Sequence, residues 1–302
     1  MTLDYLPRLF ALALAVFFLL HSICGLVASF AARPAIRFFQ SFSPRIAARL
    51  VLTLRFLPFA IALFLAIGVC VPGYLRYEPE ARAEPVGLLC LACSGLCVLT
   101  CLLSTRRAIC ALRATSACLR RPVSLSPCVA GIFVPRIVVP LQARNLLSPD
   151  ELGIAIAHER AHAAAHDNLK RLLLLLAPGV APFFRGYDLL EQAWARLAEW
   201  AADDDAVSRQ PARALSLAAA LVRLSRSPHA SHASCMTASL LLDASSLAVR
   251  VDRLLDMPSP PRRPNVALAA SLAALLLTGA LVILARAPSL LTVHAFLERF
   301  IH

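Results

Sequence analysis

Lysine is almost absent from this sequence of 302 residues: Lys170 is its only example, so the formal net charge of +12 comes almost entirely from arginine. A basic balance can indicate nucleic-acid binding, but the sequence lacks the interleaved aromatic and basic side chains that would support it. The arginines gather beside long apolar runs instead. We therefore expect no direct binding of nucleic acid, and we interpret the charge as a signal of orientation in a membrane.

The chain contains more and longer apolar runs than a soluble domain would. Hydrophobic residues make up 59% of it, whereas a soluble domain is nearer half apolar. Four runs approach the ~20 residues needed to cross ~30 Å of hydrocarbon; they cover about 9–32, 50–72, 86–103 and 263–287. The first is longer than the apolar part of a signal peptide, so we favour a retained span. A fifth run, Leu172–Phe184, is too short to span and contains prolines. We expect a helix end there that lies against the bilayer or the other spans.

The arginines in the loops predict the orientation of the chain. Four lie between the first two runs and five within residues 105–121, whereas the loop between the second and third runs has two arginines and three glutamates. The positive-inside rule then places the N-terminus outside. The expected plan is three spans in 1–104, a cytoplasmic domain in 105–262, a fourth span in 263–287 and a short extracytoplasmic tail in 288–302.

Four cysteines in the third run share one helical face: Cys90, Cys93, Cys97 and Cys101. One interpretation is a metal or redox site, and the other is close packing of small, soft side chains against a neighbouring helix. No histidine or carboxylate accompanies them, and metal motifs usually have paired spacing. We favour packing and leave open whether these cysteines do more.

The segment after the third run has the pattern of an α+β domain. The β-branched stretch "GIFVPRIVVP" (131–140) indicates a strand, which Pro135 restricts to a sheet edge or a bulge. Ser148 and Glu151 form a capping box at the start of a helix that we expect to continue to about Ala177. Further helices are expected over about 187–208, 212–225 and 245–256.

The stretch "HERAH" carries the chemistry. On a helix, His158 and His162 lie one turn apart on the same face and can occupy two corners of a zinc tetrahedron. Glu159 is rotated away from them, so it can act as the general base toward a metal-activated water. The motif also arises by chance on amphipathic helices, but an apolar helix would not otherwise bury such groups without partners. In a straight helix His166 lies about 12 Å in rise from His158, too far to share one ion. We therefore expect it at the surface or supporting a ligand from outside.

A third ligand is expected in "LAEWAADDDAV". Glu199 lies 37 positions after His162, which leaves room for a second helix to return antiparallel. Asp203 follows one turn later on the same face, where a carboxylate can hold the free nitrogen of a ligand histidine. The alternative is a solvated acidic face, because Asp204 and Asp205 come next. With HExxH upstream at this spacing, we favour ligation by Glu199.

These motifs, in this order, resemble those of the BlaR/MecR-type antirepressor metallopeptidases, membrane gluzincins related to the HtpX and CAAX-prenyl endopeptidases. The resemblance covers most of the chain. It rests on "GIFVPRIVVP", "LSPDEL", "HERAH", Asp167 five residues after His162, "EWAAD" and "RVDRLL". That ordered set is far more specific than HExxH alone.

The resemblance implies a multi-pass zinc endopeptidase of the bacterial cytoplasmic membrane. Its α+β gluzincin-type protease domain would lie in the cytoplasm, which agrees with the arginine counts. It implies one Zn²⁺ per chain bound by His158, His162 and Glu199, with Glu159 as the base and Asp203 and Asp167 as supporting carboxylates. In related gluzincins an edge strand binds the substrate backbone by β-augmentation. Our candidates for that strand are Ile132, Val134, Ile137 and Val139.

The expected partners are the lipid bilayer and a protein substrate, for which a winged-helix repressor or the chain itself is a candidate. Homodimer formation is left open. The best-studied members carry a penicillin-binding sensor after the last span, whereas no Ser-x-x-Lys motif follows that position here, so direct β-lactam sensing is not expected. Two alternatives remain: a quality-control protease for misfolded membrane proteins, and an inactive membrane signal transducer.

Overall fold

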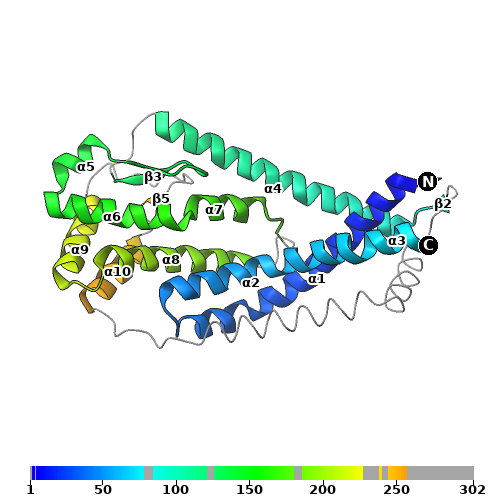
Figure 1. The fold of residues 1–302 in the computed structure, drawn as a ribbon, viewed down its shortest axis with the longest axis horizontal. Coiled ribbons are helices and arrows are strands. Elements are labelled where there is room, and N and C mark those ends of the chain that lie inside the picture. Colours follow the sequence, from blue (N-terminus) through cyan, green and yellow to red (C-terminus); the bar gives the residue numbers. More distant parts are fainter. Residues whose placement is uncertain are drawn as a thin grey trace.

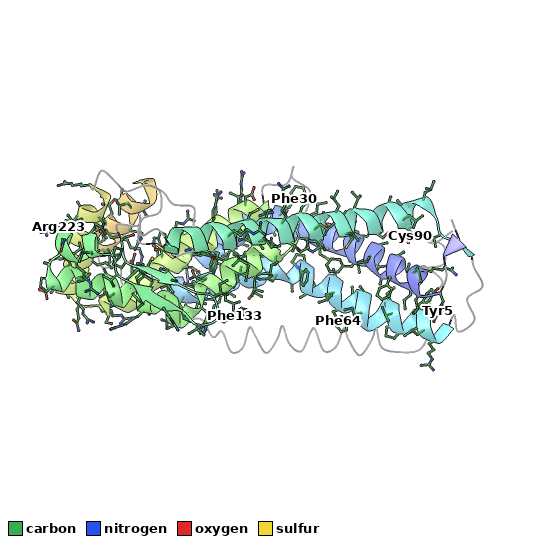
Figure 2. All side chains as sticks on the ribbon, turned by 90° about the horizontal axis from the view of Figure 1, so that it is seen from above. Tyr5, Phe30, Phe64, Cys90, Phe133 and Arg223 are labelled. Carbon is green, nitrogen blue, oxygen red and sulfur yellow. The ribbon has the colours of Figure 1, made fainter. Side chains whose placement is uncertain are left out.

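The computed structural model describes residues 2–3, 5–77, 84–120, 126–179, 186–226, 238–239 and 244–256. The predicted fourth span over 263–287 and the tail over 288–302 lie outside the described residues. The described part is elongated and mostly helical (Figure 1). Tyr5 and Cys90 mark the end formed by the long apolar helices, and Arg223 marks the opposite end (Figure 2).

Within the described part of the chain, three helices are long and apolar enough to cross a membrane. They are α1 (Tyr5–Phe39), α2 (Pro44–Leu65) with its extension through the π-helical turn η1 (Ala66–Cys70) into α3 (Val71–Tyr77), and α4 (Leu88–Arg120). Strands β1 (Thr2–Leu3) and β2 (Glu84–Pro85) pair antiparallel at one end of this bundle. Several large apolar side chains on these helices are exposed, for example Phe30 at 74%, whereas small residues such as Ala15 are fully buried. That distribution is usual for packed membrane helices, and the chain is a membrane protein.

The cysteine face of α4 is partly a packing surface. Cys90 and Cys93 are buried in one cluster with Ala15 of α1. Cys97 is also buried, and Cys101 is exposed. Within the described residues, the one group of histidine, cysteine and acidic side chains arranged to hold a metal ion lies elsewhere, on α6 and α8. The structure therefore agrees with the packing interpretation for Cys90 and Cys93.

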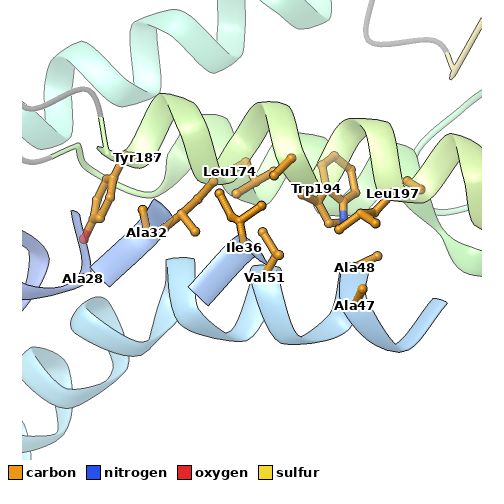
Figure 3. Close-up of a cluster of buried hydrophobic side chains, with 13 residues drawn as sticks. Ala28, Ala32, Ile36, Ala47, Ala48, Val51, Leu174, Tyr187, Trp194 and Leu197 are labelled. Atoms are coloured by element: carbon orange, nitrogen blue, oxygen red, sulfur yellow. The ribbon is translucent and has the colours of Figure 1, made fainter. Parts of the chain in front are cut away.

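A large buried apolar cluster joins the membrane helices to α8 (Gly186–Val207). In Figure 3, side chains of α1 and α2 interdigitate with those of α8 and of Leu174 on α7 (Asp167–Leu176). The labelled members are Ala28, Ala32, Ile36, Ala47, Ala48, Val51, Leu174, Tyr187, Trp194 and Leu197. Because many of the α1 and α2 members are alanines, α8 can approach both helices closely. The position of α8 is thus set by the membrane helices.

Polar contacts reinforce this junction inside the bundle. The Nε2–H of the buried His21 on α1 donates to the carbonyl of Pro178, at 3.0 Å. Arg55 of α2 donates from Nε to Glu191 of α8 at 2.9 Å, and its guanidinium lies 4.0 Å from the ring centre of Tyr187. The described part of the fifth apolar run is therefore a helix end that lies against the spans, as predicted.

The sheet differs from the single strand expected over 131–140. It has three antiparallel strands in the order β4-β3-β5, namely β3 (Cys128–Ala130), β4 (Arg136–Val138) and β5 (Ala238–Ser239). Gly131 has φ +91°, and a Cβ there would lie 2.5 Å from the carbonyl oxygen of Val134. Only glycine tolerates this turn readily. The β-branched residues between Gly131 and Pro135 consequently connect two strands.

The helix expected from Pro149 to Ala177 is also interrupted. The predicted capping box is present: the Ser148 hydroxyl accepts from the backbone N–H of Glu151, whose carboxylate accepts from the N–H of Ser148. However, His166 adopts the left-handed conformation with φ 55° and ψ 41°, which separates α6 (Pro149–Ala165) from α7. The other helices are α5 (Leu141–Leu146), α9 (Pro211–Ser225) and α10 (Ala244–Asp256). α8, α9 and α10 match their predicted ranges closely.

Candidate metal centre

α6 and α8 bring two imidazoles and a carboxylate together in the interior. The Nε2 atoms of His158 and His162 are 3.1 Å apart. One oxygen of Glu199, Oε2, lies 3.4 Å from Nε2 of His158, and the other, Oε1, lies 3.5 Å from Nε2 of His162. All three side chains are at most 1% exposed. Their ligand atoms lie within 4.8 Å of one another, so the residues predicted to share an ion converge on one point.

A second carboxylate stands behind each histidine. Nδ1 of His158 is 2.9 Å from Asp203 on α8, and Nδ1 of His162 is 2.7 Å from Asp167 at the start of α7. For His162 this contact is a hydrogen bond in which Nδ1–H faces the carboxylate, which leaves Nε2 for the side of Glu199, whereas Nδ1 of His158 lies at ion-pair distance from Asp203. The left-handed residue His166 makes the second pair feasible, because it turns the chain immediately before Asp167. His166 itself is exposed, as predicted.

Two side chains that hold this arrangement were not predicted. Arg250 of α10 donates from Nε and Nη2 to both oxygens of Asp203, at 2.9 and 2.6 Å, and its Nη1 lies 3.2 Å from Glu199. Asn168 donates from Nδ2 to the carbonyls of Val129 and Gly131, both at 3.0 Å, and so fixes the β3–β4 turn to α7. Arg250 lies in the quoted stretch "RVDRLL", but no local pattern connects it to an aspartate 47 positions earlier.

The electrostatics of the group favour bound positive charge. Burial alone would lower the pKa of His162, but Glu199 and Asp167 raise it to about 10. Burial opposes ionisation of Asp203 as well, yet Arg250 and His158 lower its pKa to about 2. Glu199 is held well below its ordinary pKa despite its burial, chiefly by His162. Ionised carboxylates facing converging imidazole nitrogens form a donor set that suits a divalent cation.

Glu159 differs from these carboxylates. It is completely buried, and burial raises its pKa to about 7 against the opposing influence of His158 and His162. Both of its carboxylate oxygens are enclosed and have no hydrogen-bond partner among the described residues. Buried polar groups are nearly always satisfied by protein or water, and their exceptions point to a functional role. The residues present therefore fit a metal ion together with a water that Glu159 contacts.

Comparison with known protein families shows that residues 110–254 match the family model described as BlaR1 peptidase M56. This segment is an M56 peptidase domain. It extends from the second half of α4 to α10 and contains every residue of the candidate metal centre. No curated protein and no solved structure matches the chain. The family expected from the ordered motifs is thereby confirmed.

The four predicted substrate-strand residues do not all lie at a strand. Ile132 and Val134 lie in the β3–β4 turn, so their assignment to a strand was wrong; Gly131 and Pro135 terminate the strands on either side of them. Ile137 lies in β4, and Val139 directly follows it. β4 is an edge strand of the described sheet, as the proline suggested. Among the described strands, the outer edge of β4 is unpaired and lies near α6, so it is a candidate surface for a peptide.

The acidic run after Asp203 is divided between two environments. Asp203 is buried, whereas Asp204 pairs with Arg253 of α10 at 2.7 Å on the surface, and Asp205 pairs with Arg45 of α2. The solvated acidic face considered as an alternative is therefore real for Asp204 and Asp205. It does not include Glu199 or Asp203, which are both 1% exposed.

Proposed function

We propose that the M56 domain is a zinc-dependent endopeptidase that cleaves a protein at the cytoplasmic face of a bacterial inner membrane. The observation that carries the proposal is the buried convergence of His158, His162 and Glu199 beside the carboxyl group of Glu159, whose oxygens have no hydrogen-bond partner among the described residues. Four arginines at the adjoining ends of α1 and α2 support the cytoplasmic placement of the domain: Arg33, Arg37, Arg45 and Arg49. The contact of α8 with α1 and α2 supports action close to the bilayer.

The chain's own residues have distinct tasks in peptide hydrolysis. His158, His162 and Glu199 would hold the zinc ion, which would supply a Lewis acid for the scissile carbonyl and would lower the pKa of water to about 7. Glu159 takes the proton from the attacking water and delivers it to the leaving amine. Glu159 lies next to His158 in a fully buried site, where a carboxyl group can accept a proton and later donate it. Asp203 and Asp167 keep the two imidazoles in the required tautomer.

The substrate is proposed to bind as an extended strand along β4. β4 carries Arg136 to Val138 at one edge of the described sheet, and backbone pairing at such an edge gives affinity without requiring one sequence. On the other side of β3, the chain's own residues Ala238–Ser239 already pair as β5. Extended segments thus fit this sheet next to α6, which supports either a repressor or the chain itself as the substrate.

A reconstituted cleavage assay tests the proposal. The full chain in lipid nanodiscs with Zn²⁺ is incubated with a purified winged-helix repressor, and products of both proteins are identified by mass spectrometry. Glu159→Gln should abolish cleavage while retaining bound zinc, because it removes the base and no ligand. Asp188→Asn, an exposed acidic position on α8, is the matched control and should cleave normally. Equal cleavage by Glu159→Gln and the control would contradict the mechanism, and cleavage only of unfolded membrane proteins would favour quality control.

A further inference from the structure

Arg250 occupies an unusual position for a basic residue. It is 2% exposed, and it lies on α10, which follows in sequence all the residues expected to touch the metal. Its guanidinium forms a two-pronged contact with Asp203 through Nε and Nη2, and Nη1 reaches Glu199 at 3.2 Å. One cation therefore bridges the expected metal ligand of α8 and the carboxylate that holds His158.

The geometry of this contact requires arginine rather than any positive charge. The planar guanidinium offers parallel N–H groups that match the two oxygens of a carboxylate, and it still has a third direction for a further acceptor. A lysine ammonium is a point charge on a flexible stem and cannot maintain both contacts in a fixed orientation. The sequence uses lysine only at position 170, where a partly exposed ammonium makes a single contact with Asp167 at 2.8 Å.

We propose that Arg250 is a positioning residue for the metal centre, which fixes the carboxylates of Glu199 and Asp203 and through them the metal-binding face of His158. The inference rests on the proposed metal site. Without Arg250, Asp203 and Glu199 would be buried one turn apart on α8 with less opposing charge, a strongly unfavourable arrangement. The two carboxylates would then separate, and the ligand atoms would lose the convergence that binds an ion.

The same helix provides a matched control. Arg253 lies one turn after Arg250 on α10 and also forms a two-pronged contact, with Asp204 at 2.7 and 2.9 Å. Asp204 is half exposed and is not part of the metal-binding group, so this pair is an ion pair close to the surface. Such pairs contribute little to stability. Arg250→Gln and Arg253→Gln therefore make the same chemical change on one helix, and they differ in whether the lost partner supports the metal centre.

The experiment measures zinc affinity rather than activity. The full chain and its variants are purified in detergent and stripped with a chelator, and Zn²⁺ binding is followed by competition with a chelating dye. Removing a group that supports a metal ligand typically weakens binding 10- to 100-fold, and we expect that range for Arg250→Gln. Arg250→Lys should fall between Arg250→Gln and the parent, because it restores charge without the two-pronged contact. Arg253→Gln should bind as the parent does.

A double variant keeps the test decisive if Arg250→Gln folds poorly. Arg250→Gln with Asp203→Asn removes a cation and an anion together, and its loss of affinity should be smaller than the product of the two single losses, because the residues act on one another. Affinity of Arg250→Gln equal to that of Arg253→Gln, or independent losses in the double variant, would overturn the inference alone. Failure of the parent chain to bind zinc would overturn the proposed function and this inference with it.

Discussion

A glycine-to-alanine substitution at Gly186 tests whether α8 is held by the membrane helices. Gly186 is the first residue of α8 and faces Ser29 of α1. A Cβ added there would lie 2.3 Å from the Cα of Ser29, 2.4 Å from its Cβ and 2.7 Å from its carbonyl oxygen. Two of these three atoms are backbone, so no side-chain rotation relieves the clash. α8 must move away from α1.

The size of that movement follows from the contact. Ordinary contact begins at 3.4 Å, so the helices must separate by roughly 1 Å at this crossing, and overpacking of this kind costs about 1–3 kcal/mol. Gly153 on α6 is the control, because a Cβ there meets nothing within 4 Å. In a helix interior, alanine is favoured over glycine by about 0.5–1 kcal/mol. The same substitution should therefore destabilise at position 186 and stabilise at position 153.

Tryptophan fluorescence provides the assay. Trp194 is 3% exposed within the contact between α8 and the membrane helices, and the chain has one other tryptophan, Trp200. Unfolding of the full chain in detergent, followed by this fluorescence, should give a lower midpoint for Gly186→Ala than for the parent and a higher one for Gly153→Ala. Zinc affinity should fall with Gly186→Ala, because Glu199 lies on the displaced helix. If both variants are as stable as the parent, the close approach of α1 and α8 does not exist.

Three further predictions concern polar contacts. Asp167→Asn should weaken zinc binding by about 10-fold or more, because it removes the charge that faces Nδ1 of His162, whereas Asp188→Asn should not; equal affinities in the dye competition would contradict this role. Arg55→Gln should reduce the free energy of unfolding by about 3 kcal/mol, because it leaves Glu191 without its ion-pair partner. This value is the lower end of the range for breaking a buried ion pair, since Glu191 is partly exposed. Arg49→Gln, at an exposed position on the same helix, should have little effect. In metal-free protein the pKa of Asp203 is lowered from 3.8 to about 2, so its ionised form stabilises the fold above pH 4. About 2 kcal/mol of the free energy of unfolding should therefore be lost as the pH falls toward 2. Urea unfolding across that range would show the loss for the parent, and a loss of the same size in Asp203→Asn would refute the assignment.

The parts of the site that are local in sequence could be predicted, because helical geometry determines them. His158 and His162 share a face at a separation of four residues, whatever the rest of the chain does. Glu199 and Asp203 share a face for the same reason, and their pairing with α6 required only that a second helix return antiparallel. The ordered motifs supplied the remaining information. The apolar runs likewise predicted α1, α2 and α4, because their length and hydropathy are sufficient signals of a span.

The parts that depend on tertiary contacts could not be predicted. No glycine or proline marks the break at His166, whose left-handed conformation accompanies the pairing of Asp167 with His162 and of Asn168 with the β3–β4 turn. Arg250 reaches Asp203 only after α9 and α10 have folded back against α6 and α8. The strand error at 131–140 is different in kind. Gly131 and Pro135 are turn signals within the stretch, but its β-branched residues favoured one continuous strand, so the turn between β3 and β4 was not predicted.

The metal content of the purified full chain tests the central claim most directly. Protein prepared in detergent without added chelator is analysed by inductively coupled plasma mass spectrometry, beside the variants His158→Ala, Glu199→Ala and Glu159→Gln. We predict one zinc per chain in the parent and in Glu159→Gln, and a large loss of zinc in both His158→Ala and Glu199→Ala. A parent chain that contains no stoichiometric zinc, or zinc that remains bound when His158 and Glu199 are replaced, would contradict it.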